Sequence, residues 1–175
     1  MEELTLSILV IPIIALTLVF LGYLHFVKRV VDRRNYTRFM IVVALTSFIL
    51  NFIWELGQGP LYEGFAYDLK HISFCALASI ADMLMVFILL LAFGLLYENA
   101  YWITKMDSSS VISLILIGGA GAILAEVLHT LRGDWSYADA MPLLPAVDVG
   151  IVPILQFTIL PWLIFLISKK YIKGR

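Results

Sequence analysis

Five long apolar stretches dominate this sequence and decide which solvent it can fold in. At a rise of about 1.5 Å per residue, a helix of about 20 residues crosses the roughly 30 Å hydrocarbon core of a bilayer. With 62% hydrophobic and 14% charged residues, the chain has too few polar side chains to cover a water-soluble globule. The sequence therefore predicts an all-α integral membrane bundle of five transmembrane helices. We expect one domain over residues 1–175, with helices over 4–27, 39–58, 71–97, 111–131 and 150–168.

Proline, glycine and serine mark several of the expected helix ends. Gly59-Pro60 should end the second helix, because proline disfavours helical geometry in the residue before it. The serines at positions 108–110 are expected to cap the fourth helix. Pro153 and Pro161 fall inside the fifth helix, where we expect them to kink it and to free backbone carbonyls for a site.

Basic residues are concentrated in alternate connectors. Placing the first connector, the third connector and the C-terminal tail on one side of the membrane collects ten of the twelve basic residues there: Lys28, Arg29, Arg33, Arg34, Arg38, Lys105, Lys169, Lys170, Lys173 and Arg175. Because Lys and Arg favour the cytoplasmic side, we expect a multi-pass protein of the cell membrane with its N-terminus outside and its C-terminus in the cytoplasm. The net charge of −1 argues against a nucleic-acid partner.

Three carboxyl groups lie within the apolar stretches, where an ionisable side chain costs about 2.5–3.5 kcal/mol on insertion scales. Counting from the expected helix ends places Glu55, Glu126 and Gln156 about 6–9 Å below the outer surface, with Asp82 deeper. We therefore expect an outward-facing polar pocket at this level. No comparable polar cluster is expected in the inner half of the membrane.

Amide and aromatic side chains are predicted to complete the pocket. Beside the acid candidates Glu55, Asp82 and Glu126, the expected substrate-binding residues are Asn51, Trp54, Gln58, Tyr62, His129, Trp135, Tyr137 and Gln156. Simpler roles exist for many of them, since amides join helices by hydrogen bonds and aromatics gather at membrane interfaces, as we expect of Trp102 and Trp162. The carboxyls fit such roles least, because three acids without a buried Lys or Arg cannot all be charge-paired.

The connector over residues 132–149 is longer than most connections between helices. It carries Trp135 and Tyr137, which are expected to lie at the outer leaflet. We expect this connector to close over the pocket.

Carboxyls beside aromatics indicate acid–base chemistry on a lipid-soluble molecule. A carboxylic acid in apolar surroundings donates a proton well, and a second carboxyl can accept one. Protonating an alkene or epoxide would form a carbocation, which aromatic faces stabilise. We expect an enzyme of the cyclase or isomerase type acting on a hydrophobic, isoprenoid substrate, with Glu55 as donor and Asp82 or Glu126 as base. A proton-coupled small-molecule transporter and a non-catalytic lipid-binding membrane protein are the alternatives.

Other chemistries lack a signal in the sequence. No HExxH or paired-histidine spacing indicates a metal site, and no phosphate-binding loop indicates a nucleotide. We expect neither a metal nor a cofactor. The expected partners are a lipid-soluble small molecule and membrane lipids, and the sequence indicates no oligomeric state.

Two segments carry a resemblance to known families. The pattern N-x-x-W-E-x-x-Q-x-P-L-Y begins at Asn51 and the pattern W-S-Y-x-x-A-M-P begins at Trp135. Together with Gly150, Pro153 and Gln156 they resemble a widespread family of uncharacterised small prokaryotic multi-pass membrane proteins. The resemblance covers the second helix and residues 126–161, about half of the chain.

The N-x-x-W-E segment alone is also similar to that of the integral membrane terpene cyclases of fungal meroterpenoid pathways. This similarity implies that Glu55 is an acid residue and that an aspartate is its partner. Asp82, Asp139 and Asp148 are all candidates for that aspartate.

Overall fold

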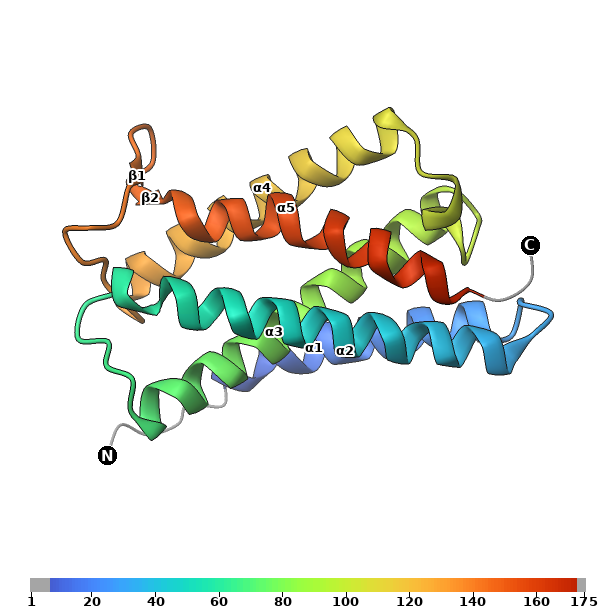
Figure 1. Ribbon diagram of the computed structural model, residues 1–175, viewed down its shortest axis with the longest axis horizontal. Helices are drawn as coiled ribbons and strands as arrows, with labels where there is room; N and C mark the ends of the chain where they lie inside the picture. Colours follow the sequence, from blue (N-terminus) through green and yellow to red (C-terminus); the bar gives the residue numbers. More distant parts are fainter. Residues whose placement is uncertain (1–6, 173–175) are drawn as a thin grey trace.

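The computed structural model describes residues 7–172 and contains five long helices (Figure 1). They are α1 (Ser7–Val27), α2 (Arg33–Gln58), α3 (Leu69–Leu96), α4 (Ser108–Arg132) and α5 (Ile151–Ser168). All five are long and apolar enough to cross a membrane, so the predicted all-α membrane bundle is confirmed. Residues 4–6 of the expected first helix, Lys173 and Arg175 lie outside the described residues.

Aspartates begin three of the helices, and they correct two expectations from the sequence. Each accepts a hydrogen bond from the backbone three residues later: Asp32 from Asn35 N at 2.9 Å, Asp68 from His71 N at 2.8 Å, and Asp107 from Ser110 N at 2.8 Å. The second helix therefore begins at residue 33 instead of 39, because Asp32 satisfies an N–H group of its first turn. The expectation that serines 108–110 cap the fourth helix is wrong, since Asp107 does so.

The helices pack in an open arrangement in which α2 contacts α3 and α5, α4 contacts α5, and α1 contacts α3. α3 crosses the bundle obliquely, and the start of α1 and the end of α5 lie at opposite ends (Figure 1). The first half of α1 leaves Ile11, Ile14 and Leu18 more than half exposed. In a bilayer these side chains face lipid, where exposed apolar surface carries no penalty.

The apolar core lies toward the end of the bundle where α1 and α3 finish, here called the basic end because connectors 28–32 and 97–107 adjoin it. Its fully buried members include Phe39, Val43, Val86, Leu114, Ile164 and Phe165, all 0% exposed. Trp102 also belongs to this core: it is 3% exposed and donates to Leu90 O at 2.9 Å. Its expected place in the interfacial belt is therefore wrong, whereas Trp162 lies on the surface.

Proline acts differently in α5 than expected. Pro153 lies in the first turn, where its missing N–H breaks no intrahelical bond. Pro161 lies in the helix interior and deprives the carbonyl of Phe157, four residues earlier, of its helical donor. A Cβ added at Gly118 of α4 would collide with this carbonyl oxygen, so the freed carbonyl faces α4 and does not join the polar site.

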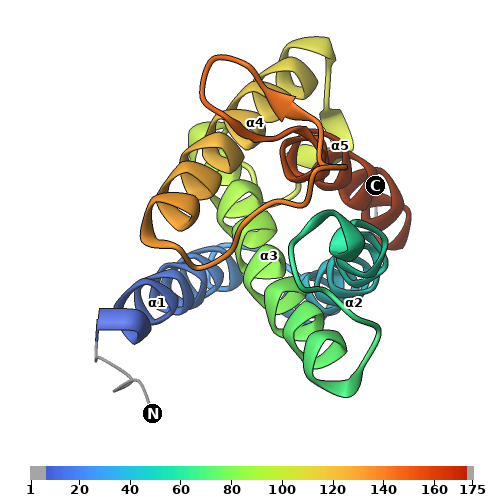
Figure 2. The ribbon, with the colours of Figure 1, turned by 90° about the vertical axis from the view of Figure 1, so that its left-hand side faces the viewer.

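The segment that connects α2 to α3 begins with a short 3-10 helix, η1 (Gly59–Leu61). The predicted end of the second helix at Gly59-Pro60 is therefore confirmed. The connector after α4 pairs with the residues that follow η1: Glu63 N donates to Ser136 O at 3.0 Å, and Ala138 N donates to Leu61 O at 3.0 Å. It then forms a small antiparallel pair, β1 (Leu143–Leu144) with β2 (Val149–Gly150). The connector thus crosses from α4 to α2 over one end of the bundle, here called the acidic end (Figure 2).

Candidate functional site

Three helices bring five polar side chains into one hydrogen-bond network at the acidic end. α2 supplies Asn51, Glu55 and Gln58, α3 supplies Asp82, and α5 supplies Gln156. Asn51, Gln58 and Gln156 are buried, and Glu55 and Asp82 are partly buried. All five were predicted from the sequence as site residues, and the structure brings them together.

Gln156 is the centre of this network and is only 1% exposed. Its Nε2 lies 3.0 Å from Asn51 Oδ1, 3.1 Å from Glu55 Oε1 and 2.9 Å from Asp82 Oδ2. Its Oε1 accepts from Gln58 Nε2 at 3.1 Å. A primary amide carries two N–H groups, so it cannot serve three acceptors fully at the same time. One acceptor is therefore left for another proton donor.

A protonated carboxyl group of the network would be such a donor. Glu55 and Asp82 lie within hydrogen-bonding range of each other, although they come from different helices. Two carboxyl groups can share a hydrogen bond only when one proton lies between them. Gln58 Nε2 also donates to Glu55 Oε1 at 2.7 Å, which holds the pair in place.

Further side chains of α2 fix the orientation of this network. Trp54 Nε1 donates to Gln58 Oε1 at 3.2 Å, so the amide oxygen of Gln58 faces Trp54 and its nitrogen faces the carboxyl pair. Asn51 Nδ2 donates to Ser47 O at 2.9 Å and to Ser47 Oγ at 3.2 Å. Ser47 was missed in the sequence, although its position one helical turn before Asn51 could have indicated it.

Glu126 of α4 forms a second cluster with the connector. Its Oε2 accepts hydrogen bonds from Trp135 Nε1 at 3.3 Å and from the hydroxyl of Tyr137. Tyr62 packs against both rings, with centroid distances of 6.1 Å to Trp135 and 5.6 Å to Tyr137. Glu126 is 7% exposed, so these aromatic groups cover it from the connector side.

His129 packs against the Trp135 ring of this cluster. Its ring stacks on that of Trp135, with the ring centroids 4.3 Å apart and an interplanar angle of 20°, and its Nδ1 hydrogen-bonds to Asp134 Oδ2 at 2.6 Å. A histidine in this place orients Trp135, and its ring nitrogen is occupied by Asp134. Its predicted part in substrate binding stays a prediction.

Tyr62 joins the two clusters. Burial is the largest cause that raises its pKa. The negative charges of Glu126 and Glu55 raise the pKa further, and Tyr137 and Asp82 add smaller effects in the same direction. The phenol therefore lies within electrostatic range of all three carboxyls. Burial and the bond to Glu126 likewise raise the pKa of Tyr137, which keeps its hydroxyl protonated as a donor. The expected convergence of three carboxyls at one end of the bundle agrees with this geometry.

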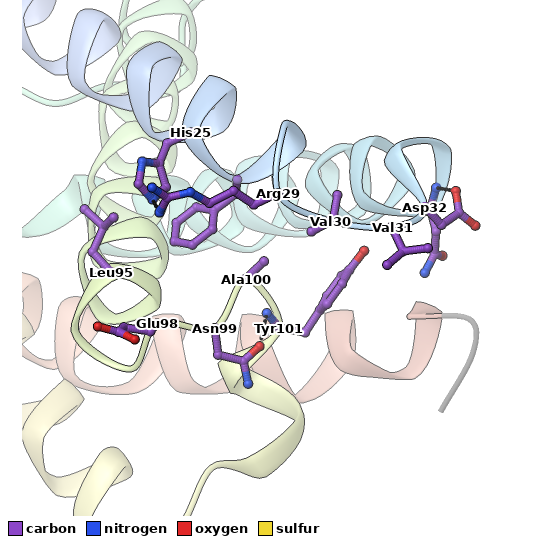
Figure 3. A pocket seen from close by; sticks show the side chains of 12 residues that line it. His25, Arg29, Val30, Val31, Asp32, Leu95, Glu98, Asn99, Ala100 and Tyr101 are labelled. Atoms are coloured by element: carbon purple, nitrogen blue, oxygen red, sulfur yellow. Dashed lines mark hydrogen bonds between the residues drawn. The ribbon is translucent and has the colours of Figure 1, made fainter.

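A large cavity lies elsewhere, at the basic end. It has a volume of about 720 Å³ and is lined by residues of both connectors, among them Arg29, Glu98 and Tyr101 (Figure 3). This cavity is built from connectors and helix ends, whose relative positions depend on how the helices pack. The expectation that the inner halves of the spans carry no polar cluster stays a prediction.

Within residues 7–172, no three His, Cys, Asp or Glu side chains are grouped so that they could hold a metal ion. Comparisons with protein-family models, with curated proteins and with solved structures found no match for this chain. Its function must therefore be argued from the geometry of its own residues.

Proposed function

We propose that this protein is a membrane-embedded acid–base enzyme that isomerises or cyclises a lipid-soluble, isoprenoid substrate. The observation that carries the proposal is the Glu55–Asp82 carboxyl pair, hydrogen-bonded within a buried amide network. Two adjacent carboxyl groups add little to the stability of a helix–helix contact, since both must be desolvated. Acid–base chemistry gives a reason for their presence.

The reaction needs one proton donor and one base. The proton held between Glu55 and Asp82 would add to a carbon–carbon double bond, leaving a carbocation in the substrate. The faces of Tyr62 and Trp135 would stabilise that cation. Glu126 would then remove a proton from a neighbouring carbon, which forms a new double bond and leaves the substrate isomerised or cyclised.

The hydrogen bonds of Glu126 support its role as the base. Both bonds from the connector reach Oε2, which leaves Oε1 as the oxygen for a substrate proton. A donated hydrogen bond from a Trp N–H requires an acceptor, so Glu126 acts as an acceptor in this arrangement. We therefore assign the donor role to the Glu55–Asp82 pair and the base role to Glu126.

The distribution of basic residues supports an orientation in which the acidic end faces outside the cell. A proton-coupled transporter would need polar groups between the two ends. Instead, the fully buried side chains of Phe39, Val43, Val86 and Ile164 separate the acidic site from the cavity at the basic end. This apolar layer favours an enzyme over a carrier.

The test is incorporation of deuterium into lipid that copurifies with the protein. Protonation of an alkene in D₂O attaches deuterium to carbon, where it remains after return to water and is detected by mass spectrometry. We expect the wild-type protein to label a copurified isoprenoid. Glu55→Gln should label it at least 100-fold more slowly, since general acid catalysis contributes about 10²–10⁴-fold.

Asp139→Asn serves as the matched control, because the aspartate beside Glu55 is Asp82, whereas Asp139 is an exposed carboxyl of the connector. It should label lipid at the wild-type rate. Copurification of ordinary phospholipid alone, with no deuterium on carbon, would refute the enzyme and favour a non-catalytic lipid-binding protein. Loss of folded Glu55→Gln protein together with absent labelling in the wild type would make Glu55 a packing residue.

A further inference from the structure

The cavity at the basic end combines opposite charges that do not meet. Figure 3 shows His25 and Arg29 on one wall, at the end of α1, and Glu98 on another, after α3. The guanidinium of Arg29 hydrogen-bonds to the His25 ring. Among the residues that the structure describes, the Glu98 carboxylate has neither a hydrogen bond nor an ion pair. The cavity therefore presents a cation and an unpaired anion to whatever occupies it.

The backbone of Glu98 gives a second reason to expect a ligand. Its φ of 49° lies in the left-handed region, one residue after the C-cap Tyr97 of α3. Glycine or asparagine is usual at this position, and a negative charge there opposes the helix dipole. A glutamate in this place carries two local penalties, which a cation bound in the cavity would offset.

The other polar groups around the cavity are already engaged. Asp32 caps α2 through Asn35 N, and Asn99 Oδ1 accepts from Tyr101 N at 2.9 Å. Burial and the negative charge of Asp32 raise the pKa of Tyr101, so its hydroxyl stays neutral. The Arg29 guanidinium keeps further N–H groups beyond its bond to His25, and Glu98 has no partner among the described residues, so these two charged groups remain for a ligand.

The position of the cavity indicates an amphipathic ligand. Its lining includes Phe26, Val30 and Leu95, and Leu95 is 50% exposed at the end of a membrane-spanning helix. A second cavity of about 380 Å³ lies in the same half of the bundle between α1 and α2, with mostly apolar walls. A headgroup in the first cavity would therefore have apolar surface beside it for an acyl chain.

We propose that this cavity binds the headgroup of an aminophospholipid, with the phosphate at Arg29 and the primary ammonium at Glu98. A phosphate takes charge-assisted hydrogen bonds from a guanidinium, and a primary ammonium donates them to a carboxylate. A quaternary ammonium lacks N–H groups and cannot do so. The volume of about 720 Å³ is in the range of small-molecule sites, about 300–1,000 Å³.

The test uses the full-length protein in detergent, offered equal amounts of phosphatidylethanolamine, phosphatidylcholine and phosphatidylglycerol, with bound lipid counted by native mass spectrometry. We expect preferential retention of phosphatidylethanolamine. Arg29→Gln and Glu98→Gln should each weaken it by about tenfold to a hundredfold, which corresponds to one charged hydrogen bond of about 1.5–3 kcal/mol. Arg38→Gln and Asp139→Asn, which do not line the cavity, should retain it unchanged.

Glu98→Gly guards against a variant that merely misfolds. It removes the carboxylate and suits the left-handed backbone, so it should melt no lower than the wild type and still lose the preference. Equal retention of the three lipids would overturn the proposal. Binding of phosphoethanolamine in solution without retention of phosphatidylethanolamine would also overturn it and assign the cavity to a water-soluble ligand. The site lies at the opposite end from the carboxyl pair, so failure of the deuterium experiment leaves this proposal standing.

Discussion

Replacing Gly118 with alanine tests whether close contact between α4 and α5 sets the geometry of the acidic end. A Cβ at this position would overlap the carbonyl oxygen of Phe157. That oxygen belongs to the backbone of α5 and cannot rotate away as a side chain would. The two helices would have to separate, and they carry Glu126 and Gln156, one from each cluster of the site.

Two effects of opposite sign determine the magnitude. Alanine is favoured over glycine in a helix interior by up to about 1 kcal/mol. Overpacking costs about 1–3 kcal/mol, with the upper part of that range expected against a rigid carbonyl. We expect Gly118→Ala to lower the free energy of unfolding by about 1–2 kcal/mol.

Gly121→Ala is the matched control, since it lies on the same helix and a Cβ there would meet nothing within 4 Å. It should leave stability unchanged or raise it by up to about 1 kcal/mol. The measurement is SDS-induced unfolding of both variants in mild detergent micelles. Equal stability of the two variants would refute the contact between Gly118 and the Phe157 carbonyl, and with it our account of where the carbonyl freed by Pro161 points.

Two further predictions concern groups outside the membrane spans. Tyr137→Phe removes the hydroxyl that donates to Glu126 and should lower the free energy of unfolding by about 1.5–3 kcal/mol. Because the pKa of Tyr137 is raised above its usual value near 10, the stability that the hydroxyl contributes should be full below about pH 10 and be lost at higher pH. Unfolding of the wild type and the variant, measured across this pH range, would show the loss. The bonds from Ser110 lower the pKa of Asp107, so the stability lost in Asp107→Ala should be full above about pH 4 and shrink as the pH falls below that value, and an unchanged difference at pH 2 would contradict the capping role.

The membrane spans could be predicted closely because apolar length is a local property of the chain. Their ends were predicted less well. Asp32 and Asp107 begin their helices earlier than the apolar stretches do, since each helix starts where an aspartate can cap its first N–H groups. Charged residues such as Arg33 and Arg34 thus belong to α2 although they lie beyond the hydrocarbon core.

The members of the candidate site could be predicted, but not their partners. Polar groups in apolar spans must face protein, and counting residues gives their depth, which is how Glu55, Asp82, Glu126 and Gln156 were selected. Their bonds could not be derived in this way. The bonds of Gln156 reach residues 74 to 105 positions away in the sequence, and they depend on how each helix is rotated about its axis.

The sequence by itself determined how many helices are long and apolar enough to cross a membrane and which of them carry the carboxyls, because apolar length and position along a helix need no tertiary information. Only the tertiary structure decided that Glu55 meets Asp82, that the connector covers Glu126, and that Arg29 and Glu98 line one cavity without touching. These facts follow from the lateral packing and rotation of the helices and from the path of the connectors. Such contacts join residues far apart in the chain, and no local pattern encodes them.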